Sequence, residues 1–226
     1  MAESDRTAVV RDSLGVAVAT GTYGLSFGAV GVASGLDVLQ TCALSVLMFT
    51  GASQFALVGV LGAGGSAVSG ALTALLLGTR NTLYGLRMAP LLGYSGWRRA
   101  AAAHVLIDES TAMAVNRPDR DLARTGFWTT GATILVLWNL TTLLGAVAGE
   151  QLGDPRDLGL DAAVGAAFLA LLWPRLSSPT ARLTAVLAAL VAAGAVSVTP
   201  AGVPVLVAAG VAVLVGALTP RGAERS

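Results

Sequence analysis

The sequence predicts an all-α integral membrane protein, a polytopic bundle of about six to eight transmembrane segments in one domain over residues 13–219. Hydrophobic residues make up 54% of the 226 residues and charged residues only 12%, against about 25% in soluble domains. Several apolar stretches approach or reach the length of about 20 residues that spans a bilayer. The net charge is +1, and no basic patch or aromatic platform indicates nucleic-acid binding.

The chain is expected to begin with a short cytoplasmic tail, residues 1–12, followed by a first span at about 13–34. Steps of four, three and four residues place four glycines on one helical face, which predicts close packing against another helix: Gly24, Gly28, Gly31 and Gly35. A second interpretation is that the polar residues beside them line a pathway: Thr20, Thr22, Tyr23 and Ser26.

The next region is predicted to contain short and interrupted helical segments. We expect a second apolar segment at 38–61 that is broken near Gly51, and a third at about 66–86. Residues 100–116 are mostly apolar but carry charged side chains, so we expect a short or re-entrant helix there. On a continuous helix, His104, Asp108 and Thr111 share one face.

Arginine and acidic residues alternate along the connections of the second half. Residues 117–125 are predicted to be a loop, followed by spans at about 126–148, 161–174, 183–198 and 202–219 and a tail at 220–226. The positive-inside rule predicts cytoplasmic N- and C-termini, with 117–125 inside and the acidic connection 150–161 outside. Three full spans before Arg98 and Arg99 would break this rule. Either 100–116 is a fourth span, or one segment of the front half is re-entrant.

The stretch 50–87 is apolar, yet it carries polar side chains at membrane depth: Ser53, Gln54, Arg80, Asn81 and Arg87. An arginine at that depth costs several kcal/mol unless it faces a partner or a water-filled cavity. Irregular backbone inside a bilayer is tolerated only beside a cavity or inside protein. The constellation therefore predicts a functional site. For Gln54 alone, a structural bond between helices is the simpler interpretation.

Three stretches resemble signature sequences of AzlC-type proteins: GASQF at 51–55, RNTLYG at 80–85 and IDES at 107–110. The ordered similarity covers about residues 10–125. The sequence departs from the family's pattern at Gly78, Asn81 and Ile107, where a polar residue, a histidine and a threonine are common. AzlC-type proteins are the large subunits of two-component exporters of branched-chain amino acids.

The resemblance implies a secondary transporter in the bacterial inner membrane that exports branched-chain or similar small apolar amino acids. It also implies coupling to the proton motive force and a small four-span AzlD-like membrane partner. Energy from ATP is not expected, because the sequence contains no Walker glycine loop.

A site for a zwitterionic amino acid needs a cationic group, an anionic group and an apolar pocket. Arg80 is the predicted carboxylate ligand, because a guanidinium binds a carboxylate bidentately and stays charged when buried. Asp108 or Glu109 is predicted to hold the ammonium or to carry the coupling proton, since burial disfavours a charged carboxylate. A structural Arg80–Asp108 ion pair is the competing interpretation. The other predicted substrate-binding residues are Gly51, Ser53, Gln54, Asn81 and Tyr84.

Other chemistries lack the residues that they need. The sequence has one histidine, one cysteine (Cys42) and no HExxH-like or CxxC spacing, so we expect neither a metal nor a cofactor. Ser53 is followed by Gln54 rather than by the glycine of rhomboid-like proteases, and we expect no enzymatic activity. Two other classes stay open: a passive channel and a non-transporting membrane assembly subunit.

Overall fold

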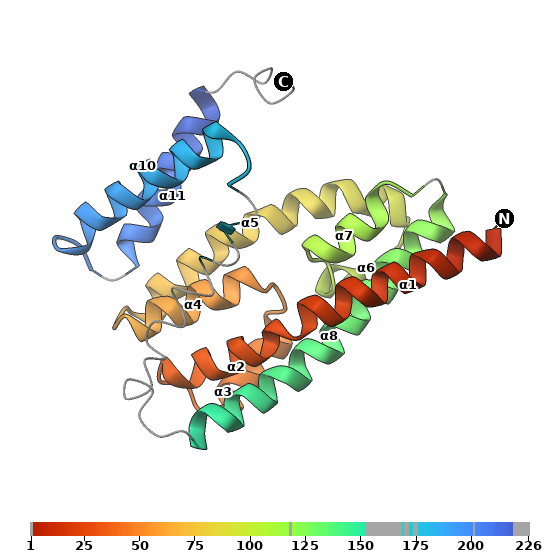
Figure 1. Cartoon of the computed structure of the whole chain (residues 1–226), viewed down its shortest axis with the longest axis horizontal. Coiled ribbons are helices and arrows are strands. Elements are labelled where there is room, and N and C mark those ends of the chain that lie inside the picture. Colours follow the sequence, from red (N-terminus) through yellow and green to blue (C-terminus); the bar gives the residue numbers. More distant parts are fainter. Residues whose placement is uncertain are drawn as a thin grey trace.

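The architecture of the chain was obtained from a computed structural model, which describes residues 2–117, 119–151, 169, 172–173, 176–200 and 202–218. Every regular element among these residues is a helix, and the predicted all-α fold class is confirmed. Two long layers of helix cross the molecule in Figure 1, with two pairs of short helices between them and one further pair to the side.

The first layer consists of α1 (Ala2–Gly21) and α2 (Tyr23–Ala33), which lie along α8 (Arg120–Gln151). Helix α1 begins at Ala2, so most of the expected N-terminal tail is helical, in a sequence that has no glycine or proline before Gly15. Helix α8 runs in the same direction as α1 and α2, because Gly126 packs against Val9 and the Thr141 hydroxyl donates to the Gly21 carbonyl over 2.6 Å.

Glycines allow α2 and α8 to approach closely. A Cβ atom added at Gly24 or Gly28 would meet backbone atoms of α8, and one added at Gly145 of α8 would meet the Leu25 carbonyl. The predicted glycine seam is therefore confirmed for Gly24 and Gly28. Gly31 packs instead against Thr41, and Gly35 does not belong to the seam, since it forms the turn after α2 with φ +92°.

The second apolar segment is a helical hairpin, made of α3 (Val38–Leu47) and α4 (Ala52–Gly62). The two helices are separated by residues 48–51, the first break, where Gly51 has φ 62° and ψ −98°. The break near Gly51 is thus confirmed. Helix α4 returns to the end of the molecule where α3 begins, because Gly62 packs against Ser34, four residues before Val38. The first hairpin is re-entrant.

The second layer is α5 (Ala67–Leu92), which packs along α4 and leads back across the molecule. The hydroxyl of Ser66 caps its first turn by accepting from the Ser69 amide at 3.1 Å. At its other end the Arg124 guanidinium donates to the Leu92 carbonyl at 2.6 and 2.9 Å, and the helix stops at Gly93 with φ 65°.

A second helical hairpin follows, made of α6 (Gly96–His104) and α7 (Asp108–Val115), with residues 105–107 as the second break. Val105 reaches Gly131 near the middle of α8, whereas Met113 is back at Gly126. The expectation of a short or re-entrant helix at 100–116 is confirmed. The prediction that His104, Asp108 and Thr111 share one helical face is wrong, because α6 ends at His104 and α7 begins at Asp108.

The remaining elements are α10 (Pro179–Val196) and α11 (Val203–Leu218), at the positions of two predicted spans. The predicted loop 117–125 is shorter than expected, because Asp119 accepts from the Leu122 amide at 2.7 Å and α8 begins at Arg120. The predicted span 161–174 and the acidic connection 150–161 fall mainly outside the described residues.

The two hairpins determine at which end of the molecule Arg98 and Arg99 lie. The C-terminal end of α5 and the N-terminal ends of α1 and α8 meet at one end of the molecule, through the contacts of Gly93 with Arg120 and of Gly126 with Val9. Arg98 and Arg99 lie on the first turn of α6 at the same end. Because the first hairpin returns to the end from which it entered, α5 leads back to the end where α1 begins, and Arg98 and Arg99 lie at the same end as Arg120.

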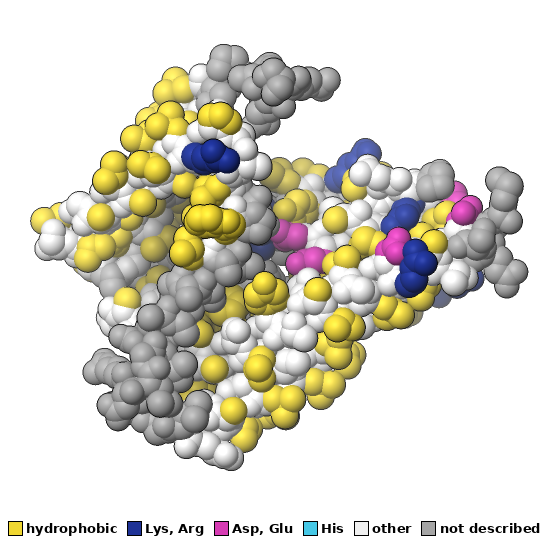
Figure 2. Space-filling model, viewed as in Figure 1, with side chains coloured by type: hydrophobic (Ala, Val, Ile, Leu, Met, Phe, Trp, Pro, Cys, Tyr) yellow, Lys and Arg dark blue, Asp and Glu magenta, His cyan; other side chains and the backbone are white. Residues whose placement is uncertain are grey.

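Apolar side chains cover much of the surface, as Figure 2 shows for one face. Within the described residues, three helical stretches are long and apolar enough to cross a bilayer: Asp5–Ala33, Arg120–Gln151 and Pro179–Val196. Helix α5 has 26 residues, about 39 Å at 1.5 Å per residue, and so has the length to cross as well.

Candidate functional site

The side chain of Arg80, at the middle of α5, lies between the two breaks. Its Nη1 atom forms an ion pair with Asp108 Oδ2 at 2.9 Å, and both side chains are 25% exposed. Its Nη2 atom donates to the Thr50 carbonyl at 3.4 Å. Arg80 therefore contacts the first break through a backbone carbonyl and the start of α7 through a carboxylate.

The neighbouring residue of α5 also contacts a break. Asn81 Nδ2 donates to the Leu106 carbonyl at 3.3 Å. The breaks themselves are adjacent, since the ring centroids of Phe49 and His104 are 6.3 Å apart. Two hairpins that enter from opposite ends thus meet at one point of α5. The carbonyls of Thr50 and Leu106 are backbone groups, and no side-chain pattern in the sequence marks them.

Gln54 and Ser110 hold the two breaks. The Gln54 amide is fully buried, accepts from the Gly51 amide at 3.1 Å and donates to the carbonyls of Leu44 and Ser45 at 3.3 Å. These bonds agree with the structural interpretation of Gln54, and one of them occupies the Gly51 N–H. Ser110 was not among the predicted site residues; its hydroxyl accepts from the Ile107 amide at 3.0 Å and donates to the Val105 carbonyl at 2.8 Å.

Several buried polar atoms around Arg80 have no hydrogen-bond partner among the residues that the structure describes: Ser53 Oγ, Arg80 Nε, Asn81 Oδ1 and Thr111 Oγ1. Such atoms are rare in folded proteins and indicate a bound polar group or water. Three of them, Ser53 Oγ, Arg80 Nε and Thr111 Oγ1, carry hydrogen to donate, whereas Asn81 Oδ1 accepts. A Cβ atom added at Gly78 would lie 3.7 Å from Ser53 Oγ, so α5 has no side chain at this position beside the serine.

Glu109 and Tyr84 complete the set of predicted site residues. Glu109 is partly buried next to Asp108 and interacts with the Thr20 hydroxyl of α1, which the sequence had marked as a pathway-lining candidate. Tyr84 lies one turn beyond Arg80 on α5 and is partly exposed. Figure 2 shows acidic and basic side chains together at a hollow in the middle of the visible face, apart from the charges near the N-terminus.

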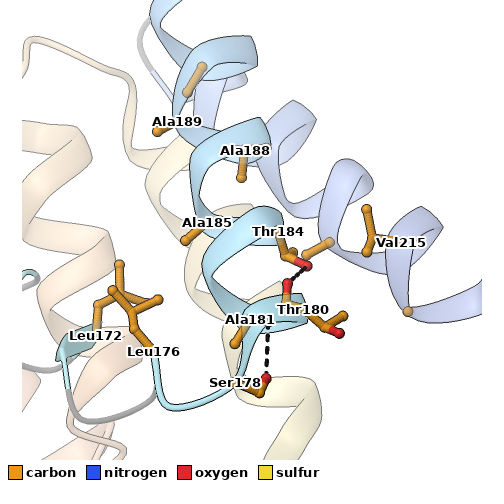
Figure 3. Close-up of a pocket in the computed structure, with 14 residues that line it drawn as sticks. Leu172, Leu176, Ser178, Thr180, Ala181, Thr184, Ala185, Ala188, Ala189 and Val215 are labelled. Carbon is orange, nitrogen blue, oxygen red and sulfur yellow. Dashed lines mark hydrogen bonds between the residues drawn. The ribbon is translucent and has the colours of Figure 1, made fainter. Parts of the chain in front are cut away.

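A groove of about 710 Å³ lies elsewhere, between α10 and α11. Figure 3 shows that alanines line it, among them Ala181, Ala185 and Ala188. Its polar groups are satisfied locally: the Thr184 hydroxyl donates to the Thr180 carbonyl at 2.8 Å, and the Ala181 amide donates to Ser178 at 3.1 Å. The groove offers no charged group to a zwitterion, so we place the candidate site at Arg80.

The fold and the site define a polytopic helical membrane protein with a charged site between two re-entrant hairpins. The family model described as AzlC protein matches residues 15–152, which include both hairpins and all the residues of the candidate site. The chain belongs to the AzlC family.

Curated relatives carry membrane-protein names. The chain is 27% identical over 153 residues to an uncharacterized membrane protein of Helicobacter pylori strain J99, covering 66% of this chain and 65% of the relative. It is 29% identical over 147 residues to the inner membrane protein YgaZ of Escherichia coli K12, covering 63% and 60%. The match thus spans just under two thirds of these relatives. No solved structure matches the chain.

Proposed function

We propose that this chain is the site-bearing large subunit of a secondary transporter that exports branched-chain or similar small apolar amino acids. The observation that carries the proposal is the Arg80–Asp108 pair, held at mid-helix between two breaks. Charged residues inside a membrane domain mark substrate or ion pathways, and transporters form their sites where helices are discontinuous. Membership of the AzlC family supports the same class.

The two ends of a zwitterion are assigned to different groups. The carboxylate binds the Arg80 guanidinium, with the free hydroxyl of Ser53 as a second donor. The ammonium binds Asp108, with the free Asn81 Oδ1 as a second acceptor. Tyr84 flanks the apolar side chain. Gly51 and Gln54 act indirectly, because their polar groups bind each other and shape the first break.

Glu109 is proposed as the group that carries the coupling proton. Asp108 is engaged with Arg80, whereas Glu109, the next residue, interacts with an uncharged hydroxyl of α1. A carboxyl group that gains and loses a proton without breaking the Arg80–Asp108 pair suits export driven by the proton motive force. The proposed partner is a small four-span AzlD-like subunit in the bacterial inner membrane.

The orientation follows from the arginines. Arg98, Arg99, Arg117, Arg120 and Arg124 belong to elements that meet at the end of the molecule where α1 begins. We place this end, and both termini of the chain, in the cytoplasm.

The test is leucine transport by the complex of this chain with its small partner, reconstituted in vesicles with and without a proton gradient. Arg80→Gln and Asp108→Asn are expected to abolish saturable leucine flux while thermal stability stays near that of the unchanged protein. Arg87→Gln is the matched control, since Arg87 is an exposed arginine on the same helix; this variant is expected to transport normally.

The outcomes separate the competing interpretations. If the ion pair is only structural, each single variant loses stability and the double variant recovers part of it, because removing one partner leaves a buried charge. Full transport by a well-folded Arg80→Gln protein contradicts the assignment. Flux that neither saturates nor responds to the gradient indicates a passive channel, and no flux from a well-folded complex indicates an assembly subunit.

A further inference from the structure

The two re-entrant hairpins are built on the same plan. Each follows a long helix and begins after a glycine with positive φ, Gly35 at 92° and Gly93 at 65°. In each case the N-cap of the next helix comes two residues later, at Asp37 and Ser95. A short helix, a break and a second short helix then return the chain to the end from which it entered.

The two breaks are held by the same device. In both, the third residue of the second short helix accepts a hydrogen bond from the N-cap amide, Gln54 from Gly51 and Ser110 from Ile107. The same side chain also donates to a carbonyl that precedes the N-cap, which is Leu44 of α3 in one hairpin and Val105, the first residue of the break, in the other. Each side chain therefore bridges its own break.

Each break also presents one carbonyl to α5. Thr50 accepts from Arg80, and Leu106 accepts from Asn81, so consecutive residues of one helix bind the two breaks. The hairpins enter from opposite ends, as the contacts of Gly62 with Ser34 and of Gly126 with Met113 establish. A short sequence identity accompanies the plan, since Tyr-Gly-Leu occurs at 23–25 and again at 84–86, in the long helix before each hairpin.

We infer that residues 23–62 and 84–115 are two inverted copies of one unit, and that Gln54 and Ser110 are equivalent positioning residues for the site between them. Inverted repeats with the site at their interface are a recurrent plan among transporters. The assignment of a positioning role rests on the proposed function. Neither residue needs to touch the substrate, because each acts by fixing the carbonyl that α5 binds.

The inference that the two hairpins enter from opposite ends of the molecule can be tested without any substrate. In a Cys42→Ser background, Ala63→Cys tests the base of the first hairpin and Ser95→Cys the base of the second; both side chains are exposed. A membrane-impermeant maleimide added to intact cells is expected to label position 63 only, and position 95 only after the membrane is opened. Labelling of both positions from the same side overturns the inverted arrangement.

The positioning role is tested by hydrogen exchange and by leucine binding to the purified complex. Gln54→Ala is expected to speed amide exchange in peptides covering 48–55, and Ser110→Ala in peptides covering 105–112, each without loosening the other hairpin. Leucine binding is expected to weaken about tenfold in either variant, with a melting temperature within a few degrees of the unchanged protein. Ser110→Thr keeps the hydroxyl and is expected to restore binding.

Ser66→Ala is the matched control, because it removes another serine hydroxyl that accepts from a backbone amide at the start of a helix, here at the far end of α5. Equal weakening of leucine binding by Ser66→Ala and Ser110→Ala overturns the positioning role, as does unchanged exchange at both breaks. If the unchanged protein binds no leucine at all, the proposed function is wrong. The maleimide labelling and the hydrogen exchange then still test whether the two hairpins are inverted copies of one unit. If Ser110→Ala does not fold, Ser110→Thr and Gln54→Ala decide the role in its place.

Discussion

Helices α8 and α10 are both long and apolar enough to cross a membrane, but they differ in what surrounds them. In the described structure a third of the apolar window of α8 is buried, at 33%, whereas none of the window of α10 is buried. Helix α8 packs against α1, α2, α3 and α7. The α10–α11 pair reaches the rest of the chain at points such as Gly202, which lies against Ser69 and Val60.

The difference in burial indicates that α8 and α10 have different roles in the structure. Around α8, glycines and buried hydroxyls such as Thr130 and Thr142 replace large side chains, which allows backbones to approach. This close packing fixes the positions of the two hairpins and hence the candidate site. In α10 and α11 large apolar side chains such as Leu183, Leu190 and Val213 are exposed, so the pair offers its surface to lipid or to another membrane subunit. Three substitutions sharpen the comparison.

The largest expected effect is at the seam between α2 and α8. Gly28→Leu places a side chain against the backbone at Thr142 and Ala146. Overpacking of this kind costs about 1–3 kcal/mol, and we expect a matching loss of thermal stability in detergent. An unchanged melting temperature and normal complex yield for this variant would contradict the close packing of α2 on α8.

A smaller effect is expected at the end of α5. Arg124→Ala removes two hydrogen bonds to the Leu92 carbonyl and the contact of its guanidinium with the Tyr94 ring at 4.8 Å. Because the Arg124 side chain is 33% exposed, we expect a cost of about 1 kcal/mol, measured as a reduced melting temperature. Arg124→Lys should recover little, since an ammonium cannot reproduce the two-pronged bond.

The smallest effect is expected in α11. A Cβ atom added at Gly210 meets nothing within 4 Å, so Gly210→Leu should change stability by less than about 0.5 kcal/mol. This substitution has the same chemistry as Gly28→Leu, and the pair of melting temperatures measures the difference between the two regions directly. Equal destabilisation by both variants would show that α11 is packed as tightly as α2.

Sequence reasoning predicted the fold class and the first break, because a glycine in the middle of an apolar run is a strong local signal. It also raised an Arg80–Asp108 ion pair as one interpretation, because a charge in an apolar region needs a partner of opposite sign, and the structure contains that pair. It predicted a short or re-entrant helix at 100–116 but not the position of the second break, since nothing between His104 and Asp108 is a glycine or a proline. That break is held by Ser110, whose hydroxyl competes with the helical hydrogen bonds.

The role of Gln54 shows a further limit. Its position beside Gly51 in an apolar region marked it as a possible substrate ligand, but its three hydrogen bonds all lie within the first hairpin. Two of the partners are carbonyls of residues nine and ten positions earlier, and they become available only because the chain turns back on itself. No local pattern in the sequence encodes that return.

The Arg80–Asp108 pair has an electrical consequence. In the empty site the two opposite charges compensate each other at 2.9 Å. On the proposed mechanism a zwitterion enters between them, with its carboxylate on the arginine and its ammonium on the aspartate, and so adds one charge of each sign. The empty and loaded sites then carry the same net charge, and the membrane potential acts on neither form through the amino acid. On the proposed mechanism, the potential therefore drives the cycle through the proton on Glu109.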